Sequence, residues 1–289
     1  MDNSLLKKKM IVLLGVCGSA FSSILIKITN APSEVLVFYR MLISVILLSV
    51  PYFISLKKEW KNIHIKEVLC CCCSGFFLAI HFRSYFLSVI NTNIVSATVL
   101  AGTEIFFVAF IMLIFFKEKI NKAGWAGIIL TFSGSVVIAV ADAGNGANLL
   151  KGDIYAISAA FFLAVYTIMG KICRKTMSTT VYTTSVYFIA AIFSMIFVLI
   201  QRIPLFGYDK VNYISAFGMA VLCTLMGHSI FSWGLKYLSA SYVSIVKLSD
   251  PVFASILAFI FFSQIPAIMV IFGCLIVIGG LFIFVTKSE

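Results

Sequence analysis

Two residues of opposite charge lie one helical turn apart in a stretch that otherwise has the composition of a membrane-spanning segment. The stretch 242–262 contains Lys247 and Asp250, and Pro251 follows at once. A charged side chain at the centre of a bilayer costs about 2.5–3.5 kcal/mol on insertion scales, so such residues normally face a partner or a cavity. Another acidic residue, Glu104, occurs in a similar context in the first half of the chain. The pattern predicts that both acids bind a substrate or a coupling ion.

The other embedded ionisable residues sort by depth when about 1.5 Å per residue is counted from the predicted helix ends. Acids and imidazoles form a layer near the middle of a hydrocarbon core about 30 Å thick, and cations flank that layer. The central residues are Glu104, Asp250, His81 and His228, and the flanking cations are Arg40, Arg83 and Lys247. This arrangement suits a zwitterion, whose ammonium group would meet an acid while its carboxylate met a cation.

Fixed pairing is the alternative reading of the same charges. Lys247 and Asp250, at i and i+3, would then pair with each other, and Arg83 with Glu104, so that the pairs only specify helix register. A neutral histidine hydrogen-bonded between helices would likewise be structural. Pro251 removes a backbone hydrogen bond directly after Asp250, which either frees a carbonyl for binding or only kinks the helix.

The elements that carry these residues are predicted to be transmembrane helices. With 62% hydrophobic and 11% charged residues, the chain has too few charges to cover a water-soluble globule. Apolar runs of about 20 residues recur along the chain, and each is long enough to cross the hydrocarbon as a helix. The expected spans are 10–28, 35–56, 68–90, 94–116, 123–140, 154–172, 181–200, 213–238, 242–262 and 267–286.

The ten spans divide into two related halves, predicted as repeats 1–146 and 147–289. Gly127 and Gly134 align with Gly273 and Gly280, and each pair is spaced by seven residues. That spacing places both glycines of a pair on one helix face, where another backbone, of the same chain or of a second chain, can approach closely. Because five crossings are an odd number, the second repeat must be inverted in the membrane, as in many secondary transporters.

The basic residues set the expected orientation. The formal net charge is +11, and most lysines and arginines of the short loops fall on the side of the N-terminus. By the positive-inside rule, both termini are cytoplasmic. This placement explains the charge without nucleic acid, for which no binding motif is present. The eight cysteines are isolated or consecutive, so their spacing predicts no metal site.

At this level of detail the chain resembles the EamA-type members of the drug/metabolite transporter superfamily. The resemblance rests on Arg40 in the second helix, Asp250-Pro251 in the ninth, and Glu118 with the glycines at 127 and 134 after the fourth. Ile105 stands where the first repeat of the family often has proline, and Gln264 where the second usually has glutamate. The resemblance implies ten helices in two repeats and transport of amino acids or related metabolites, mostly export.

We therefore expect a secondary transporter that exports a small polar metabolite, such as an amino acid, by alternating access across a cell membrane, here a bacterial cytoplasmic membrane. Uptake or facilitated diffusion of an organic solute is an alternative within transport. An intramembrane lipid-modifying enzyme and a structural subunit are alternatives of other classes, although the usual hydrolase motifs are absent. No cofactor is expected, the carboxylates would carry protons if transport is proton-coupled, and the sequence leaves the oligomeric state open.

Overall fold

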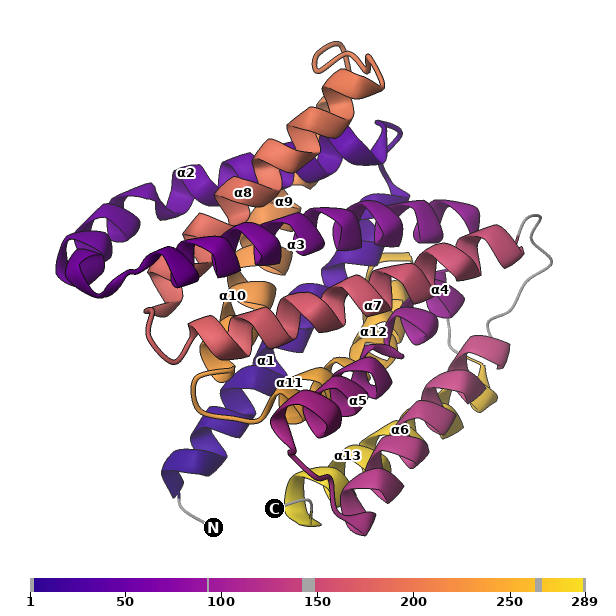
Figure 1. Ribbon diagram of the computed structural model, residues 1–289. Helices are drawn as coiled ribbons and strands as arrows, with labels where there is room; N and C mark the ends of the chain where they lie inside the picture. Colours follow the sequence, from indigo (N-terminus) through magenta and orange to yellow (C-terminus); the bar gives the residue numbers. More distant parts are fainter. Residues whose placement is uncertain (1–2, 93, 142–148, 263–266, 288–289) are drawn as a thin grey trace.

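The chain folds into a bundle of helices (Figure 1). The computed structural model describes residues 3–92, 94–141, 149–262 and 267–287, and these contain no β-strand. The first half comprises α1 (Asn3–Lys27), α2 (Ser33–Glu59), η1 (Trp60–Asn62), α3 (Ile65–Asn91), α4 (Ile94–Ala101), α5 (Glu104–Phe116) and α6 (Lys122–Ala141). The second half comprises α7 (Leu149–Cys173), α8 (Thr179–Ile200), α9 (Lys210–Gly218), η2 (Met219–His228), α10 (Ser229–Gly234), α11 (Ala240–Lys247), α12 (Asp250–Phe262) and α13 (Ile268–Lys287).

The fold predicted from the sequence, an all-α multi-pass membrane protein, is confirmed. Among the described residues, nine helical stretches are long and apolar enough to cross a membrane, and 122–138 forms a shorter apolar helix. The start of α1 and the end of α13 lie together, because Lys9 Nζ donates a hydrogen bond to the carbonyl of Val285 at 3.2 Å. The predicted repeat boundary at 146/147 falls outside the described residues.

Two of the expected spans are interrupted rather than continuous. The fourth ends as α4 and resumes as α5 after Gly102 and Thr103, and the ninth ends as α11 and resumes as α12 after Leu248 and Ser249. Proline explains the second break, because it has no backbone N–H and its ring excludes the preceding helical turn. The carbonyl of Leu248, which lies in this break, accepts a hydrogen bond from Ser135 of α6 at 3.2 Å. The backbone at the break is therefore satisfied inside the protein, as apolar surroundings require.

The two breaks contact each other. A Cβ atom added to Gly102 would lie 2.6 Å from Leu248 Cδ2, so the Leu248 side chain packs directly on the backbone of Gly102. The ends of four half-helices thus meet at one place between the two halves of the chain.

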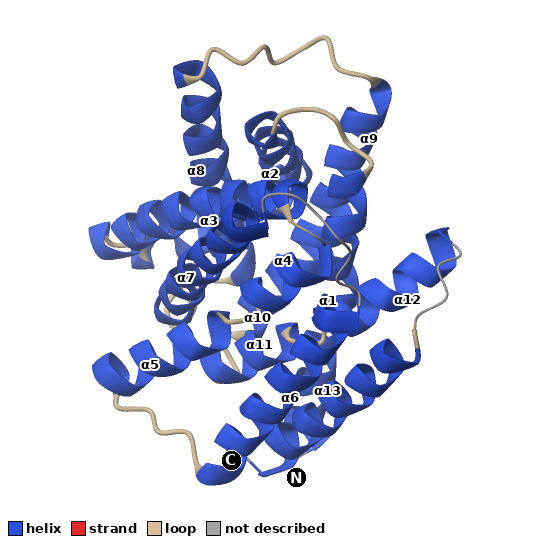
Figure 2. Ribbon diagram, turned by 90° about the vertical axis from the view of Figure 1, so that its right-hand side faces the viewer, coloured by secondary structure: helices blue, strands red, loops and turns tan. Residues whose placement is uncertain are grey.

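Helices α6 and α13 pack side by side along one edge of the bundle (Figure 2). A Cβ on Gly127 would lie 2.9 Å from the Gly280 carbonyl oxygen, and one on Gly134 would lie 2.8 Å from the Gly273 carbonyl oxygen. The glycine faces predicted from the sequence therefore join the two halves within one chain. At the opposite edge α2 packs against α8 and α9.

The eighth span contains a π-helical stretch, η2, between α9 and α10. Within it Thr224 Oγ1 donates a hydrogen bond to the carbonyl of Met219 at 3.2 Å, five residues earlier. π-helical turns are rare in proteins and are frequent at functional sites. This stretch carries Thr224 and ends at His228, and both side chains point into the protein interior.

Candidate functional site

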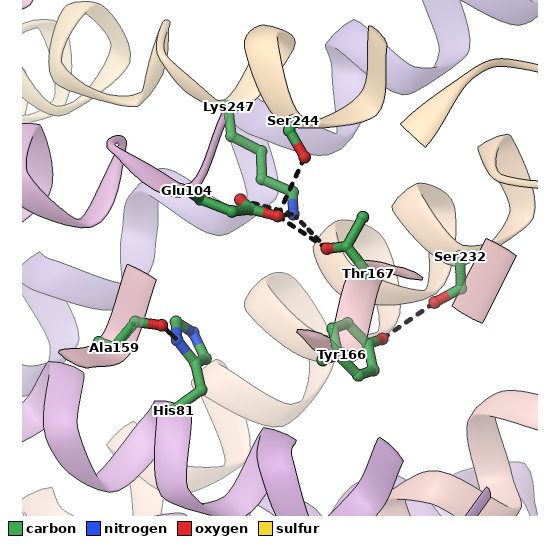
Figure 3. Close-up of polar contacts among 8 residues, drawn as sticks. All are labelled: His81, Glu104, Ala159, Tyr166, Thr167, Ser232, Ser244 and Lys247. Carbon is green, nitrogen blue, oxygen red and sulfur yellow. Dashed lines mark hydrogen bonds and ion pairs between the residues drawn. The ribbon is translucent and has the colours of Figure 1, made fainter. Parts of the chain in front are cut away.

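A buried ion pair joins the two halves of the chain where their helices break. The Nζ atom of Lys247 lies 3.0 Å from each carboxylate oxygen of Glu104 (Figure 3). Only 1% of Glu104 and 8% of Lys247 is exposed. Glu104 Oε1 also accepts hydrogen bonds from Thr167 at 2.7 Å and from Ser244 at 3.0 Å. The two charges of this pair therefore compensate each other, and hydroxyl groups donate further hydrogen bonds to the Glu104 carboxylate.

The helix ends favour the charges that stand there. Glu104 and Asp250 are the first residues of α5 and α12, and Lys247 is the last residue of α11. The N-terminus of a helix carries a partial positive charge and the C-terminus a partial negative charge. Each of these three residues has the sign that its helix end stabilises, which explains how ionisable groups are tolerated at membrane depth.

Lys247 does not form the pair with Asp250 that its i, i+3 spacing suggested. The break at 248–249 separates the two residues into different helices, so the regular geometry of one helix does not apply. Lys247 contacts Glu104 of the first half instead.

Arg83 does not pair with Glu104 either. Its Nε donates a hydrogen bond to Glu34 Oε1 at 2.7 Å. Glu34 is buried at the start of α2 and also accepts a bond from Gln201 Nε2 at 3.0 Å. Arg83 thus ties α3 to the ends of α2 and α8 and stands apart from the other predicted site residues.

Among the charged residues predicted for the site, Asp250 and Arg40 are the two that form no ion pair with a described residue. Asp250 Oδ1 accepts a hydrogen bond from Ser19 Oγ at 2.8 Å. Arg40 is 1% exposed, and its Nε donates to Thr224 Oγ1 at 2.8 Å. Its Nη1 also donates to Ser22 Oγ at 3.4 Å. The hydrogen bonds of both groups to described residues are made with hydroxyls.

Helix α1 places these two charges on one side of itself. Ser19 and Ser22 are three residues apart, so they occupy one face of α1 with an axial separation of about 4.5 Å. Ser19 binds Asp250 of α12 and Ser22 binds Arg40 of α2. The serines that contact the carboxylate and the guanidinium are therefore one helical turn apart on α1.

The two predicted histidines lie beside Arg40. Its Cζ atom lies 4.0 Å from the centroid of the Phe82 ring, which in turn lies 5.0 Å from the ring of His228. The rings of His81 and His228 are 6.2 Å apart. His81 Nδ1 lies 2.9 Å from the carbonyl oxygen of Ala159, so this nitrogen carries the proton (Figure 3). His228 Nδ1 is buried and has no hydrogen-bond partner among the described residues.

Comparison with known proteins identifies the family. The model of the EamA-like transporter family matches the chain twice, over residues 7–140 and 150–286. The chain belongs to the EamA-like transporter family. The resemblance drawn from the sequence is thereby confirmed, and the two matches fall on the two halves that meet at the helix breaks.

Relatives of this EamA-like protein carry the same general description. The transporter YxxF of Bacillus subtilis, described as uncharacterized, is 26% identical over 97% of this chain and 89% of its own length. An uncharacterized transporter of Archaeoglobus fulgidus is 25% identical over 80% of this chain and 78% of its own length. A protein of known crystal structure superposes on the whole chain, covering 98% of its own, with a TM-score of 0.79 and 15% identity, which shows the shared fold. The EamA-like chain is thus a membrane transporter.

Sequence reasoning missed the polar residues that hold the charges of the EamA-like protein in place. Thr167 and Ser244 bind Glu104, and Ser19 and Ser22 bind the two uncompensated charges. Serine and threonine are common in transmembrane helices, where they also bond their own backbone, so their identity alone gives no signal. The three-residue spacing of the serines on α1 becomes informative only once the neighbouring helices are known.

A separate cavity of ≈ 640 Å³ lies away from these charges, between α2, α3 and α8. Its wall is mostly apolar and includes neither Arg40 nor Asp250. This cavity of the EamA-like protein is therefore separate from the cluster of embedded charges.

Proposed function

We propose that this protein is a secondary transporter that exports a small zwitterion, such as an amino acid, by alternating access across a bacterial cytoplasmic membrane. The observation that supports this most strongly is that Asp250 and Arg40 form no ion pair with a described residue and contact Ser19 and Ser22, which lie one helical turn apart on α1. A zwitterion supplies both missing counter-charges at once.

In this proposal the substrate ammonium group binds Asp250 and the substrate carboxylate binds Arg40. A guanidinium suits a carboxylate because its planar fork donates two parallel hydrogen bonds. Burial of an uncompensated charge is unfavourable in the empty protein, and the bound substrate relieves it at both ends. His228, whose Nδ1 has no partner among the described residues, and His81 supply polar contacts for the rest of the substrate.

The ion pair between Glu104 and Lys247 has a different role in this proposal. It connects the two halves at their helix breaks, next to the contact between Gly102 and Leu248. The halves rock about this connection, so that the site opens first to one side of the membrane and then to the other. Arg83 fastens α3 to the ends of α2 and α8 in this proposal.

Proton exchange at Asp250 completes the proposed mechanism. The carboxylate holds either the substrate ammonium or a proton, so that each outward passage of substrate is followed by the inward return of a proton. Asp250 suits this exchange because Ser19 is its hydrogen-bond partner and no lysine or arginine of the described chain holds it in an ion pair.

Efflux from proteoliposomes tests the proposal. Liposomes loaded with a panel of radiolabelled amino acids should release a subset of them when the protein is present. A proton gradient directed into the liposomes, with the outside more acidic, should accelerate that release. Asp250→Asn and Arg40→Gln should each abolish the release, whereas Glu118→Gln, which neutralises an exposed carboxylate, should not. Normal efflux through both site variants would refute the assignment of the site, and efflux that ignores the gradient would indicate facilitated diffusion.

A further inference from the structure

The cavity between α2, α3 and α8 opens beside an unusually basic segment. Its wall begins at Val45 in α2 and continues past the exposed Trp60 to Val68 and Cys71 of α3. The segment 57–67 that connects the two helices contains four lysines and two glutamates, which leaves a formal charge of +2. A cavity with a mostly apolar wall and a basic rim is complementary to an amphiphile with an anionic head.

The two glutamates of this segment are already engaged. Glu59 Oε2 accepts a hydrogen bond from the backbone N–H of Ser178 at 2.8 Å. Glu67 accepts bonds from the backbone N–H of His64 at 3.1 Å and from Thr176 Oγ1 at 3.4 Å. Their pairing anchors the connection between α2 and α3 to the start of α8.

The four lysines, in contrast, are exposed and form no ion pair with a described residue. They are Lys57, Lys58, Lys61 and Lys66. Lysines that extend from the ends of membrane helices at an interface attract anionic lipid headgroups.

Thr184 of α8 borders the cavity, but only 3% of it is exposed and its Oγ1 is buried. The wall therefore offers a ligand mainly apolar contacts, and the charged groups lie at the rim.

We propose that this cavity binds an anionic phospholipid from the surrounding leaflet. The lysines of segment 57–67 contact the phosphate, and an acyl chain fills the apolar space of the cavity. The volume of ≈ 640 Å³ falls within the usual range for bound small molecules. Trp60, 70% exposed at the rim, lies where tryptophan anchors a protein to the interface.

Native mass spectrometry and thermal unfolding of the purified full chain in detergent test the proposal. The two probes are a phosphatidylglycerol and a phosphatidylcholine with identical acyl chains. Phosphatidylglycerol should remain bound and raise the unfolding temperature more than phosphatidylcholine does. The variant Lys57→Gln/Lys58→Gln/Lys61→Gln/Lys66→Gln should lose this preference, with affinity lower by at least about ten-fold.

Two controls separate this site from general attraction to a basic surface. Lys117→Gln/Lys119→Gln/Lys122→Gln removes lysines of another loop, and it should leave the lipid preference unchanged. Ser185→Phe, which fills the cavity without changing a charge, should reduce retention of phosphatidylglycerol. Equal retention of the two lipids, equal losses from the two lysine variants, or unchanged retention in a folded Ser185→Phe protein would each overturn the proposal.

Discussion

Removing one partner of the Glu104–Lys247 pair should destabilise the protein more than removing both. In Lys247→Met the side chain keeps its length and apolar stem, but Glu104 loses the ammonium group that lies 3.0 Å from both of its oxygens. Its remaining donors are the hydroxyls of Thr167 and Ser244. A buried carboxylate is then left without a counter-charge.

The expected magnitude follows from burial. With 1% of Glu104 exposed, water cannot solvate the orphaned charge, and breaking such a pair typically costs about 3–5 kcal/mol. Glu104→Gln should cost a similar amount, because it orphans Lys247. Replacing a buried pair with uncharged residues of similar volume is often close to neutral, so Glu104→Gln/Lys247→Met should be more stable than either single variant by roughly 2 kcal/mol or more.

A double-mutant cycle measures this coupling. The free energy of unfolding would be determined for the four proteins by reversible denaturation in mixed micelles, with Lys175→Met as a control for loss of an exposed lysine. The control should lie within about 0.5 kcal/mol of the parent. Additive losses in the double variant, or single variants as stable as the control, would show that the two residues do not form a buried pair.

Two further predictions concern the α6–α13 contact and the ion pair between Arg83 and Glu34. Gly280→Ala should destabilise the protein by about 1–3 kcal/mol in the same unfolding assay. The added Cβ would lie 2.5 Å from the backbone nitrogen of Thr131, so the α6–α13 contact would open. An unchanged free energy of unfolding would contradict that contact. Glu34→Gln should cost only about 1 kcal/mol or less, because 34% of the Arg83 side chain is exposed and water can solvate the released charge. A loss as large as that of Lys247→Met would contradict the placement of this pair.

The sequence predicted the fold well because the bilayer imposes strong rules on composition. The apolar runs located the spans, and the seven-residue glycine spacing identified the faces on which α6 and α13 pack. Pro251 indicated a freed carbonyl or a kink in the ninth span, but the break in the fourth span was not predicted, since Gly102-Thr103 is embedded in an apolar run. A break is decided by which neighbouring helices satisfy the freed backbone, and that is a tertiary property.

The sequence predicted which ionisable residues lie inside the protein better than it predicted their partners. Predicted depth in the membrane selected Glu104, Lys247, Asp250 and Arg40, of which Asp250 is partly exposed and the other three are buried. It could not choose their partners, because pairing depends on how helices from the two halves face each other. Arg83 illustrates the point, since its predicted depth was similar to that of Arg40 but its partner, Glu34, lies at the start of α2.

Direct binding of ligands that differ in one charge tests the central claim most sharply. Titration calorimetry would compare the amino acid identified by efflux with two analogues, its decarboxylated amine and its deaminated carboxylic acid. If Asp250 and Arg40 bind a zwitterion, removing either ligand charge should weaken binding by at least about ten-fold, since a buried partner is left unpaired. Loss of the ligand carboxylate should add little to the defect of Arg40→Gln, and loss of the ammonium should add little to that of Asp250→Asn. Equal affinity for all three ligands, or fully additive losses in both variants, would contradict the account.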